Sequence, residues 1–257
     1  MFNVEVVFRY LGKPSEPDIS QGVNGLLGAW IQNGQVLSGD VPITFSRTAC
    51  RAVVSCPEAD SFASRHANKW VPRVLAELAS HGLRRPTFRP LGRGLESPDA
   101  DRCRRPAWYV LITDSLSVES PLRCGQHYLP VPLYRIPHTD HRGDNYQDIL
   151  SWQRISKDCD EIEIESGPGE RFAIRQISDV ASPLSLVGRK VCGRIEKVSG
   201  VPTYYYLSRG QGRSAASERK RPCPSCGGKW LLEVPVHIFD FKCDRCRLVS
   251  NVAWGCA

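Results

Sequence analysis

Two C-x-x-C pairs lie near the C-terminal end of the chain, Cys223-Pro224-Ser225-Cys226 and Cys243-Asp244-Arg245-Cys246. Sixteen residues separate them, and this spacing is typical of a four-thiolate structural zinc site. Each turn brings two thiolates together, and a hairpin between the turns would place them opposite each other. The sequence therefore predicts a zinc ribbon over residues 223–257, in which Cys223, Cys226, Cys243 and Cys246 bind one Zn²⁺. Redox dithiols or buried free thiols are the alternative interpretation.

Charge is distributed unevenly along the 257 residues, which carry a formal net charge of +7. Residues 209–257 contain nine Lys/Arg and four Asp/Glu, a net charge of +5, whereas residues 1–208 contain 25 basic and 23 acidic residues, a net charge of +2. A basic module beside a nearly neutral body is typical of proteins that bind polyanions. A small ribbon also needs charge to stay in solution, so the asymmetry has two explanations.

The sequence lacks the features of an exported or membrane protein. Its first residues, Met1 to Val6, have neither the basic start nor the apolar run of a signal peptide. No stretch approaches the roughly 20 apolar residues that cross a bilayer. The chain is therefore predicted to be cytoplasmic, with no membrane partner. In that reducing compartment its eleven cysteines favour metal binding or burial over disulfides.

Apolar periodicity predicts an α+β body over residues 1–208, with two subdomains that would meet near residues 107–121. The elements expected in its first half are a strand at 2–9, a helix with the apolar face 23–31, strands at 42–45 and 50–56, a helix at 60–81 and a strand at 107–112. The order β-α-β-β-α-β is that of a ferredoxin-like split unit. Residues 84–106, rich in proline and arginine, are expected to form an exposed loop.

The second half of the body is expected to be mixed. The elements predicted there are a helix at 145–157, strands at 161–165 and 171–177, a helix at 182–200 and a strand at 203–207. Ser182, Pro183 and Gly200 are typical N-cap, first-turn and C-terminal residues for the second of these helices. Residues 209–222 are polar and small, and we predict a basic flexible linker between body and ribbon.

Five stretches carry a resemblance to a known family. They are PVPLYRIP (130–137), DILSWQ (148–153), GVPTYYYL (200–207), CPSCGG (223–228) and FDFKCDRCRLVSN (239–251). In these stretches the chain resembles a bacterial family of zinc-ribbon proteins of unknown function that are suggested to bind nucleic acid. The resemblance is weak before residue 107. It implies the four zinc ligands and little else.

No sequence pattern indicates catalysis. The chain has no Walker-type phosphate loop and no G-x-S-x-G elbow, so we predict that it is not an enzyme, and no small-molecule substrate is evident. Cys124 and His127 could bind a second metal ion with Cys103 or Cys159 as partners, but no completing pair marks such a site. The roles of these four residues and of Cys192 stay open.

Two functions fit these observations. In the first, the C-terminal module binds nucleic acid weakly and without sequence specificity, because contacts to phosphates position a protein without reading bases. The expected contacts are Arg219, Lys220, Arg221, Lys229, Lys242, Arg245 and Arg247. In the second, the α+β body occludes a protein partner, as an immunity or antitoxin-like factor does. The sequence does not identify the partner, the oligomeric state or a choice between DNA and RNA.

Overall fold

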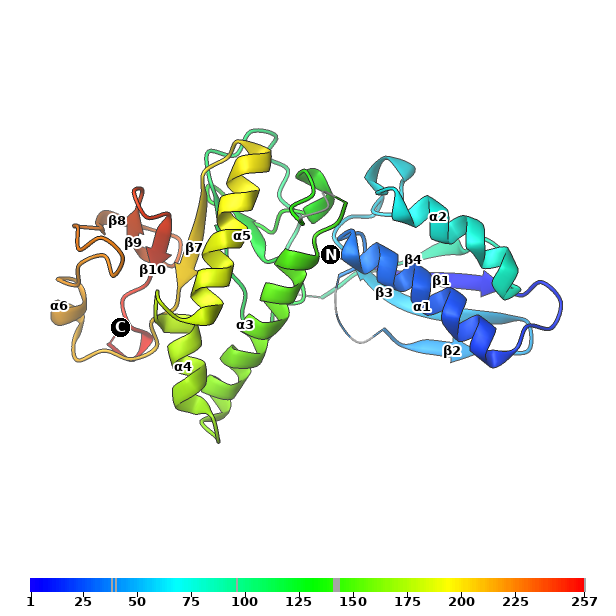
Figure 1. The fold of residues 1–257 in the computed structure, drawn as a ribbon, viewed down its shortest axis with the longest axis horizontal. Helices are drawn as coiled ribbons and strands as arrows, with labels where there is room; N and C mark the ends of the chain where they lie inside the picture. The colour runs from blue at the N-terminus through cyan, green and yellow to red at the C-terminus, as the bar shows by residue number, and fades with distance from the viewer. Residues whose placement is uncertain (38, 40, 96, 141–143, 257) are drawn as a thin grey trace. The chain divides into compact units, whose positions relative to one another are not determined.

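A computed structural model describes residues 1–37, 39, 41–95, 97–140 and 144–256 (Figure 1). The fold is α+β, with two β-sheets and a cysteine-rich cluster near the C-terminus. The chain divides into two compact units. The first comprises Met1–Arg102, Val118–Ser120 and Leu129–Gln147, and the second comprises Cys103–Ser117, Pro121–Tyr128 and Asp148–Ala257. No helix among the described residues has the length and apolar character that crossing a membrane requires.

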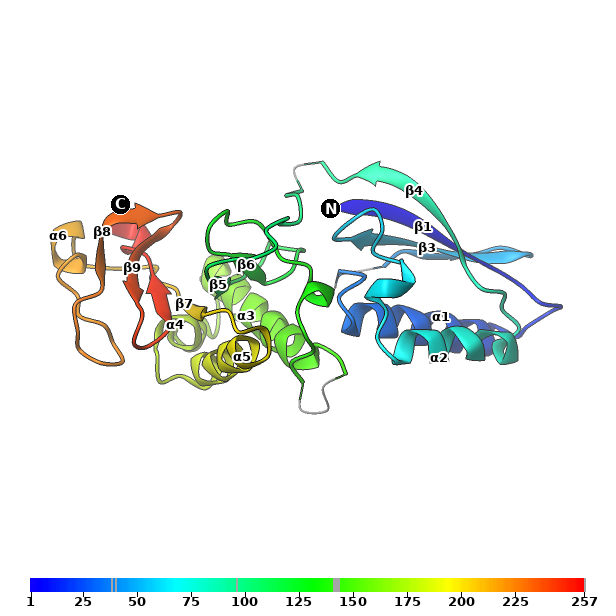
Figure 2. The ribbon, with the colours of Figure 1, turned by 90° about the horizontal axis from the view of Figure 1, so that it is seen from above.

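The first unit is a four-stranded antiparallel sheet with its helices on one face (Figure 2). Its regular elements are β1 (Phe2–Arg9), α1 (Glu16–Gln32), β2 (Ile43–Phe45), β3 (Ala49–Cys56), α2 (Trp70–Glu77) and β4 (Thr87–Arg93), with short 3₁₀ helices at Ser64–His66, Leu78–His81 and Leu133–Arg135. The strand order is β2-β3-β1-β4. Alternate residues of β1 and β3 point into one apolar core, where Phe8 and Trp30 are fully buried.

The predicted order β-α-β-β-α-β occurs in this unit, but its last strand differs from the prediction. Residues 84–106, expected to form a loop, contain β4, and residues 107–112 contribute β5 to the other sheet. All seven residues of β4 are exposed, so no alternation of buried and exposed side chains marked this edge strand in the sequence. The helix predicted at 60–81 is shorter, because Pro72 lies in the first turn of α2, where a missing N–H is tolerated.

The second unit contains a six-stranded sheet with the order β6-β5-β7-β10-β9-β8. Its elements are β5 (Tyr109–Leu111), β6 (Leu122–Cys124), α3 (Gln147–Glu165), α4 (Glu170–Ser178), α5 (Pro183–Ser199), β7 (Thr203–Leu207), α6 (Ala215–Glu218), β8 (Leu231–Val236), β9 (Phe239–Cys243), β10 (Leu248–Ser250) and a 3₁₀ helix at Trp254–Cys256. The capping prediction for α5 is confirmed, since Ser182 accepts from the Ser185 N–H and Gly200 is left-handed.

Two strands predicted in this unit are helices. Residues 161–165 continue α3, because no glycine or proline interrupts the chain between Lys157 and Gly167. The alternating isoleucines Ile162 and Ile164 are therefore not the inner face of a strand. Residues 171–177 lie in α4, whose buried positions Ala173, Gln176 and Ile177 have helical spacing. The charged residues at the other positions of α4 made this helical periodicity hard to recognise in the sequence.

The C-terminal cysteine segment contributes the strands β8, β9 and β10 to this sheet. Strand β10 pairs in parallel with β7, with Leu248 opposite Tyr205 and Ser250 opposite Leu207. The boundary predicted at residues 208/209 therefore falls inside a compact unit. Residues 209–222, predicted to be a flexible linker, contain the short helix α6 and hydrogen bonds to residues 251–255. Composition alone suggested a flexible linker because the groups that hold residues 209–222 in place lie about 40 residues further along the chain.

Candidate metal centre

The four cysteines of the two C-x-x-C pairs converge on one point. Their sulfur atoms all lie within 4.8 Å of one another, and Cys226 Sγ is 3.8 Å from Cys243 Sγ. A tetrahedral site with metal–sulfur bonds of about 2.3 Å has sulfur–sulfur edges of about 3.8 Å. Cys223 and Cys243 are buried, and Cys226 and Cys246 are half-buried. The group therefore has the donor atoms and the spacing to hold a metal ion.

Two similar turns, which we call the first knuckle (residues 223–227) and the second knuckle (residues 243–247), position these thiols. In the first, the Gly227 N–H donates to the Cys223 carbonyl at 2.8 Å, and Gly227 is left-handed with φ of 70°. Arg247 occupies the same place in the second knuckle with φ of 53°. A left-handed residue directly after the second cysteine thus closes both turns, and glycine takes that conformation without strain.

Backbone N–H groups also favour thiolates in the first knuckle. The Gly228 N–H lowers the pKa of the Cys226 thiol to about 7, while burial raises the pKa of Cys243. A thiol with a pKa near neutrality is about half ionised at neutral pH, and the thiolate is the form that binds metal. Burial of Cys243 in the absence of a cation opposes ionisation, so a bound cation would offset that cost.

Aromatic side chains supply the small core beneath the knuckles. Trp230 and Phe241 lie with ring centroids 5.0 Å apart, and Phe239 is fully buried. These aromatic side chains therefore pack the core of the segment and are not open to stack on a ligand. Trp254 differs, because 53% of its surface is exposed.

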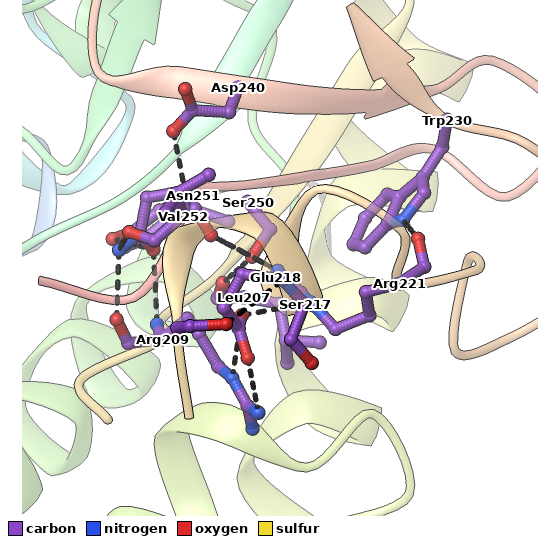
Figure 3. Close-up of polar contacts among 12 residues, drawn as sticks. Leu207, Arg209, Ser217, Glu218, Arg221, Trp230, Asp240, Ser250, Asn251 and Val252 are labelled. Atoms are coloured by element: carbon purple, nitrogen blue, oxygen red, sulfur yellow. Dashed lines mark hydrogen bonds and ion pairs between the residues drawn. The ribbon is translucent and has the colours of Figure 1, made fainter. Parts of the chain in front are cut away.

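A polar network holds residues 209–221 against the sheet (Figure 3). The Asn251 amide donates to the Arg209 carbonyl at 2.8 Å, and its Oδ1 accepts from the Arg209 N–H at 3.0 Å. The Arg209 guanidinium in turn makes two hydrogen bonds, of 3.1 and 2.9 Å, to the carboxylate of Glu218. Glu218 is only 4% exposed, so this ion pair anchors α6 in the fold. No sequence signal predicted the network, because its members are separated by up to 42 residues.

Arg221 is a structural residue of the same network. Its guanidinium lies 5.0 Å from the centre of the Trp230 ring and 4.6 Å from that of Phe241. It also donates to the Ser250 hydroxyl at 3.2 Å and to the Asn251 carbonyl at 3.0 Å. An arginine used in this way has little capacity left to bind a phosphate.

Lys242 and Arg247 are likewise engaged within the second unit. Lys242 Nζ is 2.5 Å from Asp244 Oδ1 and lies over the Tyr204 ring at 4.5 Å. Arg247 makes hydrogen bonds of 3.0 Å from Nε and from Nη2 to the two carboxylate oxygens of Glu196. The Arg247 guanidinium lowers the pKa of Glu196 through these hydrogen bonds. Three of the seven predicted nucleic-acid contacts therefore already have partners in the fold.

The other four predicted contacts are exposed cations. They are Arg219, Lys220, Lys229 and Arg245. Among the described residues, no carboxylate forms an ion pair with any of them. Arg219 and Lys220 directly precede Arg221, Lys229 follows the first knuckle, and Arg245 lies within the second. Four exposed cations thus lie within a few residues of the two knuckles in the sequence.

Comparison with known proteins places this architecture in a family. Three family models match, each described as a domain of unknown function: DUF8589 over residues 1–92, DUF2310 over residues 103–208 and DUF8594 over residues 212–256. A Haemophilus influenzae protein, named as an uncharacterized protein, is 35% identical over 263 residues that cover 99% of both chains. The chain belongs to the family of that protein. A second uncharacterized protein of H. influenzae is 40% identical over 170 residues, covering 65% of this chain and 82% of its own. No solved structure matches the chain.

Helix α5 extends the charged surface beside the second knuckle. A groove of about 350 Å³ is lined there by Arg189 and Lys190 of α5 together with Cys246 and Arg247. The Arg189 guanidinium is 3.4 Å from the Ser225 hydroxyl of the first knuckle. These two cations were not predicted from the sequence because they lie 33 and 34 positions before Cys223. The adjacent basic pair 189–190 is the signal that could have identified them.

Two buried thiols outside the knuckles have the character of core residues. Cys159 lies in α3 and Cys192 in α5. Burial raises the pKa of both thiols, which disfavours the reactive thiolate form. Their side chains act as small apolar groups.

Proposed function

We propose that Cys223, Cys226, Cys243 and Cys246 bind one structural Zn²⁺, as in a zinc ribbon. Four thiolates in a tetrahedral arrangement are the donor set that zinc takes in closed structural sites, where no position remains for a substrate. The ion would supply folding free energy to the small segment around it.

We further propose that the surface around this centre binds nucleic acid weakly and without sequence specificity. The observation that carries the proposal is a set of four exposed cations near the knuckles in the sequence, Arg219, Lys220, Lys229 and Arg245, none of which forms an ion pair with a carboxylate of the described residues. Arg189 and Lys190 add two more on α5. Lysine and arginine held on a rigid scaffold contact phosphates and position a duplex or a single strand without reading its bases. Arg221, Lys242 and Arg247 would shape this surface rather than contact the ligand.

The salt dependence of binding tests this proposal. If four to six phosphates are neutralised, the logarithm of the association constant should fall with log salt at a slope of about −3 to −5. Fluorescence anisotropy of labelled single-stranded RNA, single-stranded DNA and duplex DNA would measure it. The variant R219E/K220E/K229E/R245E should lose most of the affinity and reduce the slope by about 3.

A matched variant controls for net charge alone. Arg9, Arg47, Arg84 and Arg85 are exposed residues of the first unit, and reversing them changes the net charge of the protein equally. R9E/R47E/R84E/R85E should bind within a few-fold of the wild type. Equal losses for the two variants, or no binding by the wild type at low salt, would contradict the proposal.

The alternative, a protein partner, is supported by a different surface. The outer face of the first sheet carries Val53, exposed between the charged residues Arg51 and Glu5. A mixed apolar and charged face of this kind suits a protein partner. Affinity capture with the wild type and with R219E/K220E/K229E/R245E distinguishes the two functions. One protein recovered stoichiometrically by both favours the partner, whereas nucleic acid recovered only by the wild type favours the first proposal.

We infer that the first unit has a ferredoxin-like arrangement. We also propose that the protein is cytoplasmic. Support for the arrangement comes from the element order β-α-β-β-α-β and from antiparallel neighbours in the order β2-β3-β1-β4. An experimental structure of the first unit would test the arrangement, and cell fractionation would test the compartment.

A further inference from the structure

A second group of metal-binding side chains lies in the second unit, away from the C-x-x-C pairs in sequence. Cys103 opens the unit, Cys124 ends β6, and His127 follows three residues later. Their ligand atoms lie within 4.8 Å of one another, and Cys124 Sγ is 3.8 Å from His127 Nδ1. A tetrahedral zinc site with bonds of about 2.3 Å to sulfur and 2.0–2.1 Å to nitrogen has a sulfur–nitrogen edge of about 3.6 Å. Cys159, the other partner considered from the sequence, is not in this group.

The backbone of this C-x-x-H turn has the same form as the two knuckles. Tyr128, directly after His127, is left-handed with φ of 60°, as are Gly227 and Arg247 after the second cysteine of each knuckle. The Tyr128 N–H donates to the Cys124 carbonyl at 2.8 Å, matching the 2.8 Å bond from Gly227 to Cys223. A tyrosine rarely adopts positive φ. The chain accepts this strained conformation at the position where a knuckle requires it.

Neighbouring groups hold the turn in place. The Gln126 Oε1 accepts from the Ala107 N–H at 2.8 Å and lies 3.8 Å from Cys103 Sγ. Gln126 therefore connects the turn that contains Cys124 and His127 to Cys103. His237 Nε2 donates to the Gly125 carbonyl at 3.0 Å. A Cβ at Gly125 would lie 2.1 Å from the Trp108 ring, which leaves no room for another residue there. These contacts pre-organise the ligands, as the outer shell of a metal site does.

From this geometry we propose that Cys103, Cys124 and His127 bind a second divalent metal ion, of the zinc class. Two thiolates and one imidazole suit zinc and its chemical neighbours rather than calcium or magnesium. Binding releases the protons of the two thiols and involves no redox change. Water or a further donor completes the tetrahedron. Because His127 is exposed and Cys103 half-buried, this ion would exchange more readily than the one in the C-terminal cluster.

Metal stoichiometry tests the second site with the full chain. Protein stripped with a chelator under reducing conditions is titrated with Zn²⁺, and bound metal is measured by elemental analysis. The wild type should bind two equivalents. His127→Ala and Cys103→Ser should each bind one, Cys226→Ser should bind one, and the double variant Cys226→Ser/His127→Ala should bind none. Cys256→Ser removes a half-buried cysteine outside both groups and should still bind two.

Cobalt spectra identify which site is filled. Co²⁺ in His127→Ala should give the intense thiolate absorption of a four-sulfur site, and Co²⁺ in Cys226→Ser should give a weaker band from two thiolates. His127→Ala removes an exposed side chain, so its loss of one equivalent cannot be ascribed to a damaged core. A single equivalent in the wild type, or a second equivalent that survives both His127→Ala and Cys103→Ser, would overturn the proposal.

Discussion

The first unit and the C-terminal knuckle segment (residues 209–256) are stabilised in different ways. The first unit has one continuous apolar core that includes Phe8, Leu26 and Trp30. The strands of the knuckle segment pack on a small cluster around Phe239 and Val249, and depend otherwise on cysteine turns and on the Arg209–Glu218 pair. A short segment that cannot bury enough apolar surface needs another source of folding free energy. Loss of metal should therefore unfold the knuckle segment and leave the first unit folded.

The largest expected effect follows metal removal. Zinc contributes about 10–16 kcal/mol of apparent binding free energy to small zinc-dependent folds. Chelation, or Cys226→Ser, should therefore abolish amide protection over residues 223–250. Strand β7 should also lose protection, because β10 is its parallel partner. Hydrogen exchange with mass spectrometry measures this by segment.

The first unit, in contrast, should not respond to metal removal. Its amides should keep their protection on chelation, whereas Trp30→Ala should destabilise that unit by about 3–5 kcal/mol and leave zinc binding at the C-terminal cluster intact. If metal removal deprotects the whole chain equally, the two regions are not stabilised separately and the comparison fails.

A smaller effect is expected at Glu218, which tests whether charge pairing anchors the knuckle segment. Glu218→Gln removes a nearly buried carboxylate that pairs with Arg209, whose side chain is 38% exposed, and loss of a charged partner from such a half-exposed pair costs about 1–3 kcal/mol. The Arg209 guanidinium lowers the pKa of Glu218 below its usual 4.5. A depressed pKa means that the stabilisation is present above pH about 4.5 and is lost as the pH falls through the lower native value.

The difference in unfolding free energy between wild type and Glu218→Gln should therefore be constant from pH 8 to pH 5 and shrink below pH about 4.5. Both proteins release metal on acidification, so the difference isolates the carboxylate. Denaturant unfolding at a series of pH values measures it. If the difference in unfolding free energy instead increases as the pH falls, the Arg209–Glu218 pair is not the source of this stability.

The smallest effects concern two glycines of the second unit. Gly227 closes the first knuckle at positive φ, and alanine there should destabilise the segment by about 1–2 kcal/mol. Gly193 lies exposed within α5 with open space around its Cα, and alanine there should stabilise the protein by about 1 kcal/mol. Thermal unfolding of the two variants should shift in opposite directions. Shifts of the same sign would show that the left-handed turn is not what limits the knuckle.

Elements with local signals were predictable from the sequence. Helix α5 has its N-cap, its first-turn proline and its left-handed glycine within the element itself. In each knuckle only two residues separate the two cysteine ligands. Strand β4 and helix α4 were not predicted, because an exposed edge strand has no alternation of burial and a short charged helix has a weak period. For the candidate site, residue type identified seven cations, but the partners that engage Arg221, Lys242 and Arg247 come from distant segments.

The four-cysteine motif, the charge asymmetry and the α+β class could be predicted because they depend on residue type, spacing and short-range periodicity. The folded chain was needed to show that β10 joins β7 in one sheet, that residues 209–222 contain a helix held by hydrogen bonds, and that Cys103 lies beside Cys124 and His127. Backbone pairing, ion pairs and converging ligands all depend on groups that come together from distant parts of the chain. Local propensity contains no information on such distant partners.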